Sequence, residues 1–258
     1  MGLRYWEGAL SEVTPLTLNL PDVGSVEYEK NFINLAVCEL RFPSLLEFET
    51  ATPVQLQKRL RKDFPLYERQ EGVSIGLEIA KKEAKHVFRS RKGDSLVSFK
   101  TSAIALEMKK YKNFPEFRKQ LELLLERSKE LLDTDFFTRV GLRYINEIPI
   151  EGNLGDWIRP ELVAPLIAGT YGKVSRFFQE VRGSTTTGQY SFRHGFSGVE
   201  KTEKMLYALD FDFFDENVPF DSVLSKVNDF NRESFRFFCW TIGPKARELM
   251  GRETVTKE

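Results

Sequence analysis

Histidine, cysteine and carboxylate side chains carry much of enzyme chemistry, and this sequence places few of them at catalytic spacing. It contains two histidines, His86 and His194, and neither has a neighbouring cysteine or histidine at the spacing of a zinc site. The chain also lacks the Gly-rich loop that cradles phosphate and the Gly-x-Ser-x-Gly turn of serine hydrolases. The sequence therefore predicts no metal and no cofactor, and it favours binding over catalysis.

Asp210 and Asp212 form the acidic pair best suited to Mg²⁺. They alternate with Leu209 and Phe211, so both carboxylates are expected on one face of a strand. Clustered carboxylates can hold Mg²⁺, and a nuclease that uses this pair, or uses His194 without a metal, is one alternative function. The other interpretation is a solvated or protein-binding face, because no further acids stand at nuclease spacing.

Arg41 and Arg143 occupy matching positions in two similar strands. Each follows a leucine and precedes an aromatic residue, in Leu-Arg-Phe and Leu-Arg-Tyr. An arginine on an alternating strand is expected to pair with a carboxylate across the sheet, here Glu107 or Asp210. The alternative is direct contact with an anion or a phosphate.

A basic segment around residues 81–92 is the strongest candidate for a nucleic-acid surface. The stretch 81–119 has 12 Lys and Arg residues against 4 Asp and Glu. Basic residues interleaved with Phe88 are typical of contacts that combine phosphate pairing with base stacking. The candidate nucleic-acid-binding residues are Lys81, Lys82, Lys85, Arg89, Arg91 and Lys92. Arg193 and His194 mark the matching hairpin later in the chain; the alternative for the basic segment is a solvated hairpin.

Hydrophobic periods and turn residues divide the chain into elements that would position these groups. Strands are expected over residues 33–42, 73–79, 85–91, 95–100, 104–111, 137–148, 175–182, 188–194 and 205–213. Helices are expected over residues 54–62, 114–132, 160–168 and 220–238. Residues 1–32 form an irregular lead-in, and the chain after Gly243 is expected to be a fraying helical tail.

The expected elements occur twice in the order β-α-β-β-β(-β)-α. Three short sequence matches lie at offsets of about 102 to 104 residues, among them Leu40-Arg41-Phe42 with Leu142-Arg143-Tyr144 and Ala105-Leu106-Glu107 with Ala208-Leu209-Asp210. We therefore predict an α+β fold made by tandem duplication, with repeats at 33–135 and 136–250. One antiparallel sheet would carry helices on one face, as in TATA-binding-protein-like or helix-grip-like folds.

Composition limits the class of protein. The net charge is zero, so no field of the whole molecule attracts nucleic acid or membrane. No apolar stretch approaches the roughly 20 residues of a membrane-spanning helix, and no signal peptide is evident. Cys38 and Cys239 lie in apolar runs typical of buried, reduced thiols, which together predict a cytoplasmic protein.

Several segments resemble a sporadically distributed family of uncharacterised bacterial and archaeal proteins. They are Tyr-Glu-Lys-Asn-Phe-Ile at 28–33, Gly-Leu-Arg-Tyr-Ile-Asn at 141–146, Trp-Ile-Arg-Pro-Glu-Leu at 157–162 and Leu-Asp-Phe-Asp at 209–212. The resemblance covers roughly residues 28–250. It implies no activity, cofactor or catalytic residue, but the family's patchy distribution is compatible with an accessory role in bacterial defence or mobile elements.

The leading hypothesis from the sequence is a non-enzymatic binding module that holds a macromolecule, either protein or nucleic acid. Its candidate sheet-face residues are Arg41, Arg143, Asp210, Asp212, Arg193 and His194. The rivals are the nuclease described above and a small-ligand sensor whose Phe-rich interior encloses a cavity between helices and sheet. A homo-oligomer is compatible with all three, and no membrane partner is expected.

Overall fold

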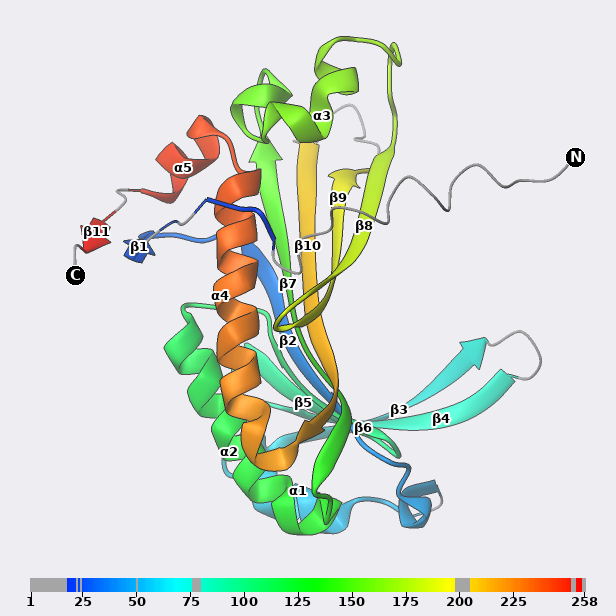
Figure 1. Ribbon diagram of the computed structural model, residues 1–258. Coiled ribbons are helices and arrows are strands. Elements are labelled where there is room, and N and C mark those ends of the chain that lie inside the picture. The colour runs from blue at the N-terminus through cyan, green and yellow to red at the C-terminus, as the bar shows by residue number, and fades with distance from the viewer. Residues whose placement is uncertain are drawn as a thin grey trace, which may run out of the picture.

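The computed structural model describes residues 18–21, 23, 25–49, 51–75, 80–197, 205–251 and 254–256. Its centre is one nine-stranded antiparallel sheet with the order β3-β4-β5-β6-β2-β7-β10-β9-β8 (Figure 1). The strands are β2 (Ile33–Arg41), β3 (Leu66–Ile75), β4 (Ala80–Arg89), β5 (Ser95–Lys100), β6 (Ala103–Met108), β7 (Phe136–Ile150), β8 (Phe177–Thr185), β9 (Gly188–Phe196) and β10 (Met205–Pro219). The predicted α+β class and antiparallel sheet are confirmed.

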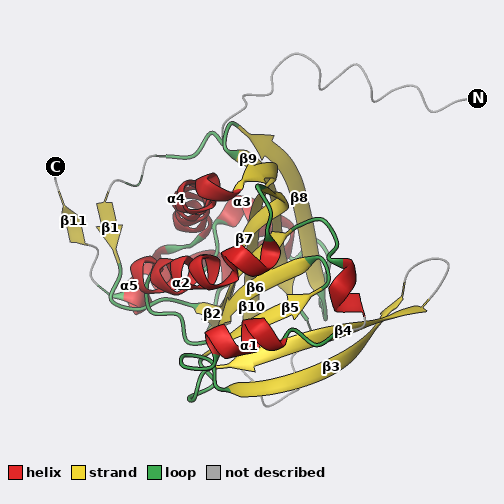
Figure 2. Ribbon diagram, turned by 90° about the horizontal axis from the view of Figure 1, so that it is seen from below, coloured by secondary structure: helices red, strands yellow, loops and turns green. Residues whose placement is uncertain are grey.

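Helices α1 (Val54–Leu60), α2 (Phe114–Leu132) and α4 (Val223–Thr241) lie on the same side of the sheet (Figure 2). Both long helices carry an apolar stripe at helical spacing, and that stripe faces the strands. The stripe residues buried by α2 and α4 include Phe117, Leu121, Leu124, Val223, Val227, Phe230 and Phe237. The core therefore fills the layer between these helices and the sheet.

Alternation along the central strands separates a core face from a helix-free face. In β2, Ala36, Cys38 and Leu40 are fully buried under the helices, whereas Glu39 and Arg41 point the other way and stay in contact with solvent. The ladder pairs Cys38 with Leu142 of β7, so the apolar face continues across the middle of the sheet. Most charged residues of the central strands consequently lie on the opposite, helix-free face, whereas Asp215 of β10 pairs with Lys226 of α4.

The elements after β2 and after β7 follow similar orders. The first run is β2-α1-β3-β4-β5-β6-α2 and the second is β7-α3-β8-β9-β10-α4, with α3 at Pro160–Ile167. In each run the last strand pairs with the first, and the two first strands, β2 and β7, pair with each other. The two long helices both span 19 residues.

The sheet register does not keep the offsets of the short sequence matches. Leu40 pairs with Ile104, whereas Leu142 pairs with Phe213. An offset of 103 from Ile104 leads to Tyr207, which is 6 residues short of Phe213 (213 − 207). The matches in the first and last strands of the two runs therefore do not occupy equivalent places in the ladder.

Several predicted boundaries are wrong, mostly near the edges of the sheet. The first hairpin strand, β3, begins at Leu66 rather than at residue 73, because its polar residues face solvent on an edge strand and hide the apolar alternation. The helical tail expected after Gly243 is present as helix α5 (Pro244–Met250), but it buries Ala246 and Met250 in the core instead of fraying. Within the expected lead-in, β1 (Ser25–Glu27) pairs with β11 (Thr254–Thr256) as a separate ribbon.

Two predictions from the sequence can be compared with the fold: the burial of reduced cysteines and the lack of a membrane-spanning helix. Cys38 and Cys239 are both buried and are not joined by a disulfide. Burial raises the pKa of the Cys38 thiol to about 12, so it stays protonated. Within the described residues, no helix combines the length and the hydropathy needed to cross a bilayer.

Candidate functional site

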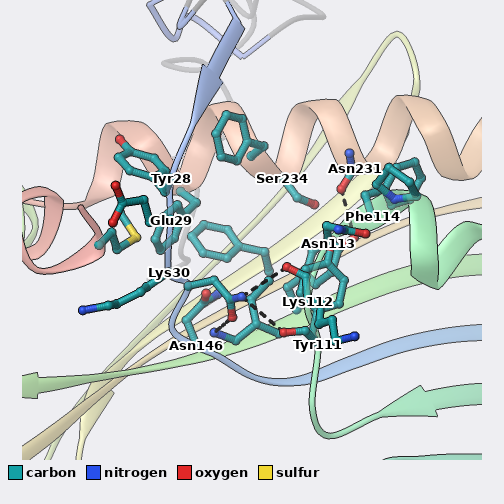
Figure 3. A pocket seen from close by; sticks show the side chains of 18 residues that line it. Tyr28, Glu29, Lys30, Tyr111, Lys112, Asn113, Phe114, Asn146, Asn231 and Ser234 are labelled. Carbon is teal, nitrogen blue, oxygen red and sulfur yellow. Dashed lines mark hydrogen bonds between the residues drawn. The ribbon is translucent and has the colours of Figure 1, made fainter. Parts of the chain in front are cut away.

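A chamber of about 580 Å³ lies between α4 and the core face of β7 and β10 (Figure 3). Volumes of this size are typical of small-molecule sites. The first residues of α2 and the segment that precedes β2 complete its walls. The chamber is therefore built from parts of the chain that are distant in sequence.

Segments that the family resemblance singled out meet at this chamber. Tyr28 comes from the segment before β2, Tyr144 and Asn146 come from β7, and Phe211 comes from β10. The register explains their proximity, because Phe211 pairs with Tyr144 and Asn146 pairs with Ile33. Strand pairing thus brings three segments that are separate in sequence together at the wall of the chamber.

The chamber is charged at its mouth and neutral inside. Glu29, Lys30 and Lys112 contribute the charged side chains among its described lining residues, and all three are exposed. The polar residues that lie deeper are uncharged: Asn146 is 3% exposed and Ser234 is 2% exposed. Figure 3 shows Ser234 reaching from α4 toward the strand that carries Asn146.

The Ser234 hydroxyl is buried without a hydrogen-bond partner among the described residues. Two comparable helix hydroxyls behave differently: Ser128 and Thr241 each donate to the carbonyl oxygen four residues earlier at 2.8 Å. Leaving a buried hydroxyl unpaired costs about 1–3 kcal/mol. Ser234, a lining residue of the chamber, therefore keeps hydrogen-bonding capacity that its own helix does not use.

Asn146 lines the chamber from the sheet side, whereas Ser234 lines it from α4. Its Nδ2 atom donates to the carbonyl oxygen of Leu209 at 3.3 Å, a bond that fixes the orientation of the carboxamide. A carboxamide carries two donors and two acceptor lone pairs, so one strand carbonyl uses only part of this capacity. A neutral donor–acceptor group is thus held at the floor of the chamber.

Two tyrosines complete the neutral wall. Tyr144 donates its hydroxyl to Oδ1 of Asn231 on α4 at 2.9 Å, which links the sheet to the helix. Tyr111 lies edge-on to Tyr144, with ring centroids 5.5 Å apart. Burial is the main reason that the pKa of Tyr111 rises to about 12 and that of Tyr144 rises well above its ordinary value. Both phenols are therefore neutral donors at physiological pH.

The helix-free face carries a chain of ion pairs instead of a cavity lined by free carboxylates. Arg143 donates two hydrogen bonds to Asp210, each of 2.7 Å, which is the cross-strand pairing that the sequence predicts. Arg193 joins the same carboxylate at 3.3 Å to Glu180 at 2.8 Å. Arg139 holds Asp212 at 3.0 Å.

Arg41 does not pair across the sheet with Glu107. Its Nε atom donates to Glu39, two residues earlier on the same strand, at 2.7 Å. Glu107 is instead paired with Lys85 of β4 at 3.4 Å. Arg41 is thereby placed at the outer end of the ion-pair chain, next to Glu39 and Arg139, which are 3.7 Å apart.

A shallow groove of about 480 Å³ runs over the β7, β10, β9 and β8 end of this face. Arg139, Arg182 and Arg193 line it together with Asp212 and Phe214. The Arg139 guanidinium lies 4.3 Å from the centre of the Phe214 ring, a cation–π contact. Arg139 pairs with Asp212, whereas Arg182 and Arg193 pair with Glu180 beside the groove, so its guanidinium groups are held by neighbouring carboxylates.

The acidic pair is unsuited to Mg²⁺ in this arrangement. Asp210 and Asp212 already accept hydrogen bonds from Arg143 and Arg139, so a cation would have to displace guanidinium groups. Burial raises the pKa of Asp212 although Arg139 opposes the shift. Among the described residues, no three or more His, Cys, Asp or Glu side chains are arranged to hold a metal ion.

The basic hairpin is less available for nucleic acid than the sequence suggests. Lys85 is paired with Glu107, and Arg89 is paired with Glu68 at 3.0 Å. Phe88 is fully buried in the core, so its ring cannot stack on a base. Arg91 and Lys92 are exposed in the turn after β4, and the side chains of Lys81 and Lys82 lie outside the described residues.

His194 lies on the core face and not with the sheet-face candidates. It is 1% exposed, stacks on Phe192, and its Nδ1 atom is 2.7 Å from the Tyr207 hydroxyl. Burial lowers the pKa of His194 to about 4. Arg193 and Asp210 point to the opposite side of the sheet, so the expected grouping of His194 with them is wrong.

The chamber residues that matter most were not among the sequence candidates. Asn146 shares the apolar face of β7 with Leu142 and Tyr144, and Ser234 falls in the apolar stripe of α4 between Phe230 and Phe237. A polar residue at a core position is the signal that sequence reasoning should have used.

A scan against protein-family models and a search of curated proteins both find no match to this chain. The family resemblance therefore stays a prediction. The chemistry of the site has to be inferred from the geometry of its own residues.

Proposed function

We propose that this protein binds a small organic molecule in the chamber under α4. The observation that carries the proposal is the partnerless Ser234 hydroxyl, buried at the wall of a 580 Å³ cavity. Folded proteins rarely leave such a group unsatisfied, and a ligand would supply the missing hydrogen bond. Aromatic walls with a few neutral polar groups match the general chemistry of ligand pockets.

Native mass spectrometry of the purified protein tests this function. The wild-type protein is expected to carry a small molecule that denaturation releases, or to take one up from a cell extract freed of macromolecules. Ser234→Phe places a ring in the chamber and should abolish this uptake. Ser225→Phe makes the same change on the exposed side of α4 and should leave uptake intact. Absence of a bound molecule in all three proteins, or equal binding by all three, would remove the proposal.

A macromolecular partner held at the helix-free face is a second candidate function. The groove between Arg139, Arg182 and Arg193 favours it, because Arg182 projects an exposed guanidinium beyond its pairing with Glu180. An anionic partner such as nucleic acid suits that charge. The nuclease alternative receives no comparable support: Arg143 and Arg139 occupy the Asp210 and Asp212 carboxylates that would hold Mg²⁺, and the His194 of the metal-free version is buried.

We also infer that the two halves arose by tandem duplication, in the manner of TATA-binding-protein-like or helix-grip-like folds. Similar element and strand orders, with one strand more in the first run, and equal lengths of α2 and α4 support this inference. The difference in strand register between the two halves would then reflect an insertion of residues within the second half. An experimental structure in which α4 does not fall on α2 once β7 is superimposed on β2 would argue against it.

A further inference from the structure

We infer, on the basis of the ligand-binding function proposed above, that the buried part of the ligand is an uncharged aromatic ring with hydrogen-bonding groups on one edge. Aromatic amides and neutral nitrogen heterocycles belong to this class. The inference follows from three properties of the chamber: the position of its charges, the placement of its neutral polar groups and the orientation of its rings. Each limits a different property of the ligand.

Charge is limited by where the ionisable residues lie. Glu29, Lys30 and Lys112 are exposed at the mouth, and Lys112 is also 3.5 Å from Glu116. The deep wall offers neutral groups, because the pKa values of Tyr111 and Tyr144 are both raised by burial. A charged group placed there would lose its hydration without meeting an opposite charge. Any charge on the ligand therefore belongs at the mouth.

Hydrogen bonding is limited by Asn146 and Ser234, which face the chamber from opposite walls. Ser234 supplies a hydroxyl that is both donor and acceptor. Asn146 supplies the hydrogen-bond donor and acceptor sites of its carboxamide that its bond to the Leu209 carbonyl does not use. A purely aliphatic ligand such as a fatty acid tail would leave the Ser234 hydroxyl buried without a partner and the remaining capacity of the Asn146 carboxamide unused. A ligand edge with at least one donor and one acceptor satisfies them.

Shape is limited by the aromatic side chains around these two groups. Phe211 of β10 and Phe238 of α4 meet edge-to-face, with ring centroids 6.4 Å apart. Tyr28 and Phe235 form a second edge-to-face pair at 6.3 Å near the mouth. Rings arranged in this way present both faces and edges to a guest, and offset or edge-to-face contacts favour a flat aromatic ligand over a puckered one.

Four small probes of similar size separate these properties. Benzamide is flat, neutral and hydrogen-bonding; benzoate and benzylammonium carry a charge at the same position; cyclohexanecarboxamide keeps the amide but is not flat. Each is titrated into ¹⁵N-labelled protein stripped of any retained molecule. The readout is the chemical shift of the side-chain amides of Asn146 and Asn231, which line the chamber.

Benzamide is expected to shift both amide signals and to bind at least tenfold more tightly than either charged probe. Cyclohexanecarboxamide is expected to bind more weakly than benzamide. Equal or tighter binding of benzoate or benzylammonium would overturn the inferred class while leaving ligand binding itself in place. Failure of all four probes would also overturn the class, and the retained molecule sought by mass spectrometry would then decide the proposed function separately.

Asn146→Leu provides a check on the hydrogen-bonding edge. The substitution keeps the side chain near its original size but removes its donors and acceptors. Benzamide binding is expected to weaken about tenfold, whereas toluene, which fills space without hydrogen bonds, should bind the variant at least as well as the wild type. Toluene binding also shows that the chamber is still formed. Unchanged benzamide affinity in a variant that binds toluene would contradict the assignment of Asn146.

Discussion

His86 and His194 are both buried on the core face, and each has its Nδ1 atom close to a tyrosine hydroxyl. The partners are Tyr67 at 2.9 Å and Tyr207 at 2.7 Å. Burial lowers the pKa of both histidines, that of His194 to about 4. The Nε2 atom of His194 has no hydrogen-bond partner among the described residues. These imidazoles are therefore neutral members of the core.

Acid is expected to destabilise the fold through His194. Its folded pKa lies below the ordinary value of 6.5, so the unfolded chain binds the proton more readily. The stabilising contribution is full above pH 6.5 and is lost as the pH falls toward 4, by no more than about 3 kcal/mol. Urea denaturation at pH 7, 5.5 and 4.5 measures this slope. His194→Leu should lower the stability at pH 7 yet flatten the slope; an unchanged slope would assign the acid sensitivity elsewhere.

Single residues were predictable from sequence where one rule decided their position. Strand alternation placed Asp210 and Asp212 on one face and paired Arg143 with Asp210. The same rule separates His194 from Arg193, because adjacent strand residues point to opposite faces. Grouping these two as sheet-face candidates ignored that rule. Ser234 was missed because an isolated serine in an apolar stripe carries no motif.

Helix α2 begins at a well-defined cap beside the chamber. Oδ1 of Asn113 accepts a hydrogen bond from the backbone N–H of Glu116 at 3.0 Å, and Pro115 lies in the first turn. The cap satisfies one of the free N–H groups at the helix start. Since Asn113 and Phe114 also line the chamber, the cap fixes part of its wall.

Asn113→Ala is expected to lower the free energy of unfolding by about 1 kcal/mol, because the N-cap hydrogen bond is lost. Asn113→Asp retains an acceptor at the same place and should stay within a few tenths of a kcal/mol of the wild type. Chemical denaturation of the three proteins gives the values. Equal loss in both variants would mean that the side chain acts through packing and not as a cap.

The predictability of an element depended on how much of it is buried. The long helices were located closely because their apolar residues recur at helical spacing over five turns. The strand β3 was placed too late because the edge of a sheet needs only one neighbour and tolerates Glu68 and Gln70 in contact with solvent. The periodicity of apolar residues in a sequence indicates which side chains are buried, and an edge strand buries few of its side chains.

The whole molecule is neutral because oppositely charged regions cancel. Residues 200–233 contain 9 acids against 4 bases and include all of β10 and the first half of α4. The basic stretch supplies β4, β5, β6 and the start of α2. Many of its charges are already paired within the fold, as in Lys85 with Glu107. Charge segregation in sequence therefore overstates the field available to a partner.

Binding of labelled single-stranded RNA, followed by fluorescence anisotropy at rising salt, tests the second candidate function. If nucleic acid binds the groove, Arg182→Glu should weaken binding at least tenfold and reduce the salt dependence. Arg91→Glu with Lys92→Glu should have the smaller effect, since these residues lie in the hairpin turn. Absence of RNA binding by the wild type at low salt would remove the nucleic-acid version and leave a protein partner.

The general architecture was accessible from sequence, but the chamber was not. Element order and amphipathic pattern were enough to predict an antiparallel sheet with helices on one face. The chamber depends on which residue of β10 lies beside Tyr144, and the short matches pointed to a register that the ladder does not follow. A one-position error in the pairing of β10 would move Phe211 from the chamber to the other face of the sheet.

The hydrogen bond from Tyr144 to Asn231 connects β7 to α4 across the chamber. A ligand thicker than one ring would require α4 to move away from the sheet at that point, which would break this hydrogen bond. Swelling of the cavity is thereby directed toward the opposite end, where Tyr28 and Met250 lie. For the ligand that we propose, length rather than thickness is therefore the dimension that can vary.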